Sequence, residues 1–154
     1  MIRTSTVFAF ATAVMLSGGW GQSLAAPGAP THYLVKNKTP INMTIVGRVS
    51  LAGQPAKEGV EVAVFDAQGT LCGASGVDVA NGGSYILQVY GDDPTTAEDE
   101  GAVAGDELRL EVYDPPRGPS APGQLSLSSA GFNEPPAFPP KFEERASYGM
   151  NIAW

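Results

Sequence analysis

Six carboxylate side chains fall within fifteen residues of one segment, 91–106, which reads GDDPTTAEDEGAVAGD. Calcium takes six to eight hard oxygen ligands and tolerates irregular geometry, so a segment of this kind could hold it. The candidate calcium ligands are Asp92, Asp93, Asp99, Glu100 and Asp106. Their spacing does not follow the EF-hand pattern, and an acidic loop that is merely solvated is the competing interpretation.

Aromatic side chains form a second group that could bind a ligand. Phe132, Phe138 and Phe142 lie in or directly after a proline-rich stretch, and Tyr33 opens the short apolar patch Tyr33-Leu34-Val35. Aromatic faces stack on sugar rings and are enriched in protein interfaces. These four residues are therefore candidate contacts for a glycan or for another protein, and packing in the protein's own core is the alternative.

The residues needed for nucleophilic or zinc catalysis are scarce. His32 is the only histidine and Cys72 the only cysteine, which is too few for a zinc site. No Gly-x-Ser-x-Gly signature occurs, so we expect no enzymatic activity and no cofactor other than calcium. Cys72 is a free thiol with no partner for a disulfide within the chain. We expect it to be buried, and an intermolecular disulfide or a reactive nucleophile is the alternative.

Residues 1–25 have the three parts of a secretory signal peptide. Arg3 supplies the positive charge, residues 7–15 form an apolar run, and small residues lead to Ala25 and Ala26. We expect cleavage after Ala25, because cleavage after Ala26 would place a proline behind the scissile bond. The apolar run is about nine residues, against the roughly 20 of a spanning helix, so no stable membrane insertion is expected. The predicted location is secreted, cell-surface or periplasmic.

The charge of the chain narrows its partners. The formal net charge is −7, and removal of residues 1–25 takes away only Arg3, which makes it −8. Nucleic acids and anionic membranes bind clustered lysines and arginines, so neither is an expected partner.

Seven segments have the residue pattern of β-strands. In 41–51, apolar Ile41, Met43 and Ile45 alternate with polar residues, and this period of two is typical of a half-buried strand. The further segments are 60–65, 70–79, 84–90, 107–113, 125–127 and 146–154. Glycine and proline in 52–56 predict a turn that joins the first two segments as a hairpin. No helical period follows the signal peptide, so we predict an all-β fold, an antiparallel β-sandwich of six to seven strands.

Three regions are expected along the chain. After the signal peptide, residues 26–40 mix proline, glycine and polar residues and are predicted to form an extended arm. Residues 41–154 form the β-sandwich domain. This domain includes a proline-rich loop at 115–140, because its prolines are incompatible with a central strand.

Several motifs in the middle of the chain are turn and strand elements: Gly53-Gln54-Pro55 after a strand, Gly83-Ser84-Tyr85 opening the next, and Gly105-Asp106 before another. With them, residues 45–113 resemble the immunoglobulin-like, prealbumin-related modules of exported bacterial and archaeal proteins, including the carboxypeptidase regulatory-like group. The resemblance implies an immunoglobulin-like sandwich and a non-catalytic module attached to, or displayed beside, another protein.

Together these features predict an exported, non-enzymatic binding or structural accessory module, whose partner is another exported protein or a surface polymer. A carbohydrate-binding module is one alternative, which exposed aromatic residues and calcium would favour. The other is an assembly subunit that forms oligomers by edge-strand pairing, with the patch 33–35 or the terminal strand as donor.

Overall fold

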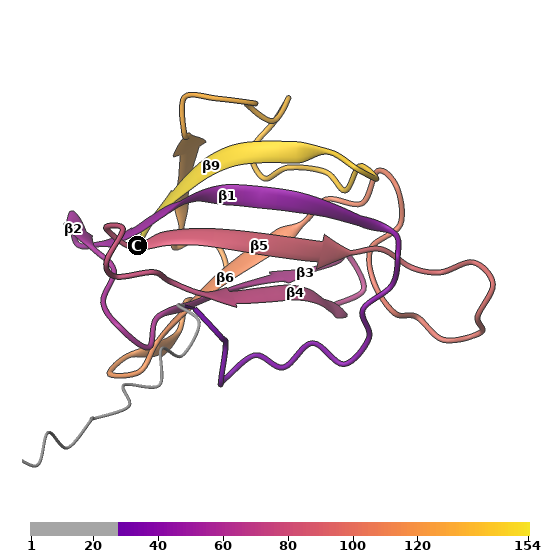
Figure 1. Cartoon of the computed structure of the whole chain (residues 1–154), viewed down its shortest axis with the longest axis horizontal. Coiled ribbons are helices and arrows are strands. Elements are labelled where there is room, and N and C mark those ends of the chain that lie inside the picture. Colours follow the sequence, from indigo (N-terminus) through magenta and orange to yellow (C-terminus); the bar gives the residue numbers. More distant parts are fainter. Residues whose placement is uncertain (1–27) are drawn as a thin grey trace, which may run out of the picture.

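Nine strands and no helix occur in the part of the chain that the computed structural model describes, residues 28–154 (Figure 1). They are β1 (Asn42–Leu51), β2 (Gln54–Pro55), β3 (Glu61–Phe65), β4 (Leu71–Gly76), β5 (Ser84–Tyr90), β6 (Arg109–Asp114), β7 (Gly118–Pro119), β8 (Ser126–Ser129) and β9 (Ser147–Ala153). Within the same range no helix is long and apolar enough to cross a membrane. The predicted signal peptide and its cleavage site at Ala25 and Ala26 lie outside the described residues and stay predictions.

The strands form two sheets. The first has the order β5-β1-β9-β8, and β2 adds two residues beside the end of β1. Its neighbours are antiparallel except β1 and β9, which run parallel with Ile45 opposite Tyr148. The second sheet has the order β4-β3-β6-β7 and is antiparallel throughout. The all-β prediction is confirmed, and the two mostly antiparallel sheets are compatible with a β-sandwich.

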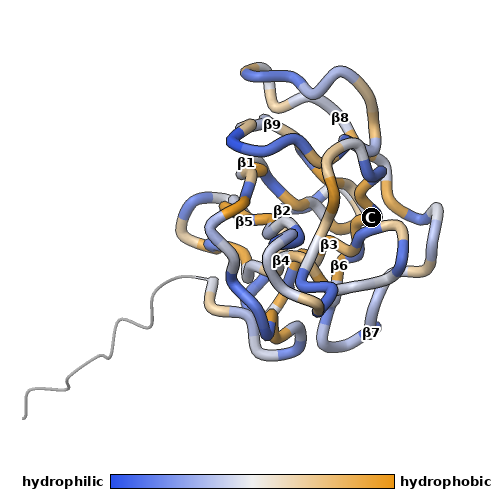
Figure 2. The backbone as a smooth tube through the Cα atoms, turned by 90° about the vertical axis from the view of Figure 1, so that its right-hand side faces the viewer, coloured by the Kyte–Doolittle hydropathy of each residue, from blue (hydrophilic) through white to orange (hydrophobic). Residues whose placement is uncertain are grey.

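The hydrophobic core lies between the sheets, because each strand turns the apolar side of its alternation inward. Met43 and Ile45 of β1 and Val62 and Val64 of β3 are all buried in one cluster. Figure 2 shows the apolar stretches of the chain concentrated on the strands in the middle of the molecule. Full burial of one such side chain contributes about 1.5–3 kcal/mol, so this alternation determines which side of each strand faces inward.

The predicted hairpin between residues 41–51 and 60–65 is wrong. β1 makes its tight turn with β2, where Leu51 lies opposite Gln54, and Ala52 adopts a φ of 50°. The chain then crosses to the other sheet and enters β3 there. This change of layer lets β1 and β3 bury their apolar sides against each other, which two neighbouring strands of one sheet could not do.

A buried tyrosine links three strands of the first sheet. Tyr85 on β5 lies opposite Gly47 on β1, and its hydroxyl donates to the carbonyl oxygen of Met150 on β9 at 2.7 Å. A Cβ on Gly47 would overlap that carbonyl oxygen. The glycine therefore leaves the space through which the hydroxyl reaches across β1. Burial raises the pKa of Tyr85, so the hydroxyl remains a hydrogen-bond donor at neutral pH.

Candidate functional site

The described part of the predicted arm, residues 28–40, lies against the outer face of the second sheet. Val62 and Val64 of β3 point into the core, so Glu61 and Phe65 point to the opposite face. The arm begins beside β4, where the carbonyl of Gly28 accepts the N–H of Gly76 at 2.6 Å, and it then runs past β4 to the start of β1 (Figure 1). Between residues 28 and 40 it forms no strand, so side chains supply most of its further contacts with the sheet.

The carboxylate of Glu61 is the main anchor of the arm. Its Oε1 accepts the N–H and hydroxyl of Thr31 at 2.6 and 2.9 Å and the N–H of His32 at 2.9 Å. Its Oε2 accepts the N–H of Tyr33 at 3.0 Å. Three successive N–H groups that surround one anion form a nest, which favours negative charge. Glu61 is only 2 % exposed, so these charge-assisted bonds are shielded from solvent.

The pKa of Glu61 reflects two opposing effects. Burial alone raises it, since it disfavours the charged form, and the hydrogen bonds from the backbone of Thr31, Tyr33 and His32 lower it. The hydrogen bonds prevail, and the pKa lies below its usual range. Glu61 is therefore a carboxylate at neutral pH, and its charge holds the arm.

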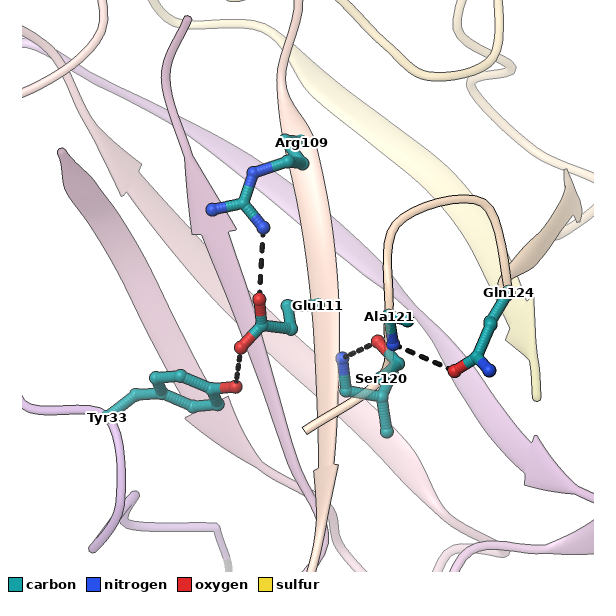
Figure 3. A network of polar contacts seen from close by, with 7 residues as sticks. Tyr33, Arg109, Glu111, Ser120, Ala121 and Gln124 are labelled. Atoms are coloured by element: carbon teal, nitrogen blue, oxygen red, sulfur yellow. Dashed lines mark hydrogen bonds and ion pairs between the residues drawn. The ribbon is translucent and has the colours of Figure 1, made fainter. Parts of the chain in front are cut away.

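Two aromatic residues of the arm provide further anchors. The Tyr33 hydroxyl donates to Glu111 of β6, whose other carboxylate oxygen binds Arg109 at 3.0 Å (Figure 3). Burial and then the bond to Glu111 raise the pKa of Tyr33. The His32 ring stacks on Tyr113 with 3.8 Å between the ring centroids. The arm is thus docked on β3 and β6, where the sequence alone predicted an extended arm with a candidate pairing strand at 33–35.

A groove lies between the arm and the neighbouring strands β4 and β5. It has a volume of about 510 Å³, and its lining includes Tyr33, Leu34, Ile86 and Tyr90. Leu34 of the arm and Ile86 of β5 are each 67 % exposed, although both are large apolar residues. Lys38 adds a positive charge to the wall. We call this feature the arm groove. Because its apolar wall comes from both arm and sheet, it exists only while the arm is docked.

The acidic loop 91–106 projects beyond the end of β5 (Figure 1). Asp93 Oδ1 accepts the N–H and the hydroxyl of Thr95 at 2.9 and 2.7 Å, and these bonds lower the pKa of Asp93. Asp92 accepts the N–H of Glu100, while Glu100 accepts the N–H of Asp93, both at 3.3 Å. Each of these three carboxylates thus accepts hydrogen bonds from donors of the loop itself.

The other two candidate calcium ligands point elsewhere. Asp99 accepts the hydroxyl of Thr70 at 3.0 Å, and Asp106 accepts the N–H of Val103 at 2.9 Å. In the part of the chain from residue 28 onward, no three His, Cys, Asp or Glu side chains come together as a metal-binding group. Calcium binding stays a prediction from the sequence.

The candidate aromatic contacts fall into two groups. Phe132 and Phe138 are 51 % and 38 % exposed, and Phe132 lies over Gly149 of β9. Phe142 is 3 % exposed and belongs to the core, and Tyr33 is 8 % exposed with its hydroxyl on Glu111, so for these two residues the alternative of packing within the protein applies. The reason for Phe142 is that its backbone pairs with Asp106, which folds the end of the proline-rich loop back over the sandwich and holds the ring against Gly91.

The thiol of Cys72 faces the interior. Cys72 is fully buried and donates to the carbonyl of Thr70 at 3.2 Å. Burial, with the nearby charge of Asp66, raises its pKa to about 12. The thiol is therefore protonated and shielded, unlike an activated nucleophile.

Two residues of this site were not singled out from the sequence. Glu61 carried a signal, because it is the only charged residue in the apolar run 60–65, and a charge in such a run needs a partner when buried. Ile86 also carried a signal, because it is an apolar residue on the outward face of its strand, between Ser84 and Gln88. Its exposure follows from that outward position.

Comparisons with protein-family models, with curated proteins and with solved structures found no match to this chain. The arm, the groove and the sheet surfaces are therefore the features that bear on its function.

Proposed function

We propose that this chain is an exported, non-enzymatic accessory module of immunoglobulin-like type that binds another exported protein through the arm groove. The observation that carries the proposal is the pair Leu34 and Ile86, both two-thirds exposed and both on the walls of one groove. Large apolar side chains gathered in a concave surface are typical of interaction sites, whereas single exposed ones need no explanation.

The composition of the groove favours a protein as its occupant. The half-buried Tyr90 also lines it, and tyrosine is enriched in protein interfaces because it combines an apolar ring with a polar tip. Lys38 and Gln88 supply polar groups at the same surface. An apolar centre with polar groups beside it is the usual anatomy of an interface between proteins.

The contacts of the lone histidine support a non-enzymatic role. The His32 ring is stacked on Tyr113, and its backbone N–H is bound by Glu61. These are the contacts of an anchor. Export, and with it a secreted, cell-surface or periplasmic location, rests on the predicted signal peptide.

A photo-crosslinking amino acid at position 86 tests the proposal in the cells that produce the protein. We expect one discrete crosslinked adduct, identified by mass spectrometry as an exported protein. The matched control carries the crosslinker at Val103, which is similarly exposed but lies in the acidic loop. Equal labelling from both positions, or no adduct from position 86, would contradict a binding site in the arm groove.

One surface favours carbohydrate binding as a second candidate. Phe132 shares a cavity of about 360 Å³ with Arg48, Ser84 and Asn151 on the outer face of the first sheet. An exposed ring beside side chains that donate and accept hydrogen bonds suits a sugar, whose rings have both apolar faces and hydroxyls. Binding on a glycan array that is lost in Phe132→Ala and kept in Phe138→Ala would support it. No binding to any glycan would exclude it.

A further inference from the structure

Two adjoining cavities lie on the outer face of the first sheet. One, of about 360 Å³, is lined by Phe132, and the other, of about 250 Å³, adjoins β8. Arg48 of β1 and Asn151 of β9 line both cavities, so the two meet at these residues. We call the pair the Arg48 groove. Its lining on β1 runs from Val46 to Ser50, about 13 Å at about 3.3 Å per residue, which is longer than one sugar ring.

The only charged side chain in the lining of this groove is Arg48. The chain as a whole has a net charge of −7, so the groove differs in charge from the rest of the protein. The other arginines between residues 28 and 154 pair with carboxylates of nearby residues: Arg109 with Glu111, Arg117 with Asp114 and Arg145 with Glu144. Arg48 takes part in no ion pair within that range, and its guanidinium donates no hydrogen bond there. The groove therefore offers a cation whose donors are available to a ligand.

The backbone that carries this cation is fixed by its neighbours. The N–H of Arg48 donates to Oδ1 of Asn151 at 3.0 Å, and Nδ2 of Asn151 donates to the carbonyl of Ser129 at 3.2 Å. The side chain of Asn151 therefore ties β1, β9 and β8 together under the groove. A backbone that is already fixed has less freedom to lose when a ligand binds, so more of the interaction with the guanidinium contributes to affinity.

The ring of Phe132 is held at one end of the groove. Ala130 donates its N–H to the carbonyl of Gly149 on β9 at 3.1 Å, and Gly149 donates its own N–H to the carbonyl of Asn133 at 2.9 Å. A Cβ on residue 149 would approach two ring carbons of Phe132 to 3.0 and 3.1 Å, so the glycine lets the ring lie directly on the sheet. The ring is thus placed by backbone bonds on both sides of it, although about half of its surface is exposed.

We propose that the Arg48 groove binds an acidic polysaccharide in which a uronic acid, a sugar that carries a carboxylate, is flanked by neutral sugars. The proposal rests on carbohydrate binding, the second candidate function, and names its ligand class. The carboxylate of the uronic acid accepts two N–H groups of Arg48, the paired geometry that a guanidinium favours. A neighbouring neutral sugar packs on the ring of Phe132. The sugar hydroxyls meet the hydroxyl side chains of the lining, Ser50, Ser84 and Ser128.

The placement of the charge distinguishes this ligand from other polymers. Arg48 lies where the two cavities meet, and the rest of the lining is uncharged on both sides of it. A neutral polysaccharide would leave the guanidinium with water as its partner. A densely sulfated one would bring several negative charges to a protein whose net charge is −7, and the groove holds a single cation to offset them. One carboxylate between neutral sugars matches this arrangement.

Titration of the isotope-labelled protein at low ionic strength, followed by NMR, tests the ligand class. The probes are tetrasaccharides of hyaluronan and of unsulfated chondroitin, in which glucuronate alternates with a neutral sugar, their uncharged methyl esters, and a heparin tetrasaccharide. We expect at least one unsulfated acid to shift the amide signals of Arg48 and Asn151 and to bind about tenfold more tightly than its methyl ester, since a hydrogen bond to a charged group is the stronger kind. Added salt should reduce this preference, because Arg48 is exposed. Heparin should bind more weakly than the unsulfated acid.

Three variants and one control locate the site. Arg48→Gln should lower the affinity for the acid about tenfold, to that of its methyl ester. Arg145→Gln is the matched control, because it removes the same charge from an exposed arginine that lines neither cavity. Phe132→Ala should weaken the acid and the ester alike, since the ring contacts a neutral sugar. Ser128→Trp fills the cavity beside β8, leaves Arg48 in place and should also weaken both.

Equal affinity for an acid and its methyl ester, or unchanged binding in Arg48→Gln, would overturn the proposal and leave carbohydrate binding intact. Tighter binding of heparin would overturn it as well, and so would an equal loss in Arg145→Gln, because the effect would then come from the overall charge. Absence of binding by every probe would also overturn it. Carbohydrate binding itself fails only if the glycan array shows no ligand either, so the two failures can be told apart.

Discussion

Replacement of Glu61 by glutamine removes the charge that holds the arm to the second sheet. In the native protein the two carboxylate oxygens accept N–H groups from Thr31, His32 and Tyr33 and the hydroxyl of Thr31, at 2.6 to 3.1 Å. A glutamine amide has one acceptor oxygen, and its NH2 group would face an N–H donor of the arm. We therefore expect the arm to detach more often while the sandwich stays folded.

The magnitude follows from the kind of bond that is lost. A hydrogen bond to a charged group contributes about 1.5–3 kcal/mol and a neutral one about 1 kcal/mol. Glutamine keeps part of the Oε1 contacts in neutral form and loses the Oε2 contact to Tyr33. The change in docking free energy is then about 2 kcal/mol, which is about 30-fold in the opening equilibrium of the arm.

Amide hydrogen exchange measures this equilibrium residue by residue. The N–H groups of Thr31, His32 and Tyr33 should lose about 30-fold of their protection in Glu61→Gln, while those of β1 stay protected. Glu58→Gln is the matched control, because Glu58 is a nearby exposed glutamate. Unchanged protection in Glu61→Gln, or an equal loss in Glu58→Gln, would refute the anchoring role of the carboxylate.

The same anchor predicts how arm docking depends on pH. The pKa of Glu61 is lowered in the folded protein, so its contribution is fully present above the unfolded pKa of about 4.3 and is lost as the pH falls through the folded value. Protection of the arm amides, corrected for intrinsic exchange, should therefore decrease below about pH 4. In Glu61→Gln this dependence should be absent, and its persistence would assign the effect to another group.

Three further predictions concern the core and the acidic loop. Tyr85→Phe leaves the Met150 carbonyl without its donor and should lower the free energy of unfolding by about 1–3 kcal/mol in urea titrations, and an unchanged value would contradict the role of the hydroxyl. Cys72 should resist alkylation in the native protein and react only after unfolding, because the thiol is buried with its pKa raised to about 12. Rapid alkylation of the native protein would contradict the burial of this thiol. A titration with millimolar calcium tests the calcium prediction: the local donors already bound by Asp92, Asp93, Glu100 and Asp106 favour an unchanged melting temperature, and a clear increase would support calcium binding.

The strands and their inward faces were predictable because alternation is a local property. Met43 and Ile45 in 41–51 are buried as the pattern indicated, and the predicted strand segment 125–127 overlaps β8. The crossing from β1 to β3 was not predictable in this way. A turn sequence gives the reversal of the chain but not the layer in which the next strand lies.

The arm and its groove depend on contacts between distant parts of the sequence. Thr31 and Glu61 are 30 residues apart, and Leu34 and Ile86 line one groove only because the bond between Thr31 and Glu61 fixes the path of the arm. Phe142 was misplaced for the same reason, since its proline-rich neighbourhood indicated a surface loop while its backbone pairs with Asp106. Local patterns indicate that such residues need partners, and the tertiary fold determines which ones.

Crosslinking from position 86 in a Leu34→Asp background tests most directly whether the docked arm forms one wall of a partner-binding groove. This change places a charge on the arm wall and leaves the Glu61 anchor intact. The expected result is loss of the adduct in Leu34→Asp and its retention in Val103→Asp, which alters an equally apolar exposed residue outside the groove. An adduct of unchanged intensity in Leu34→Asp would contradict a groove shared by the arm and the sheet.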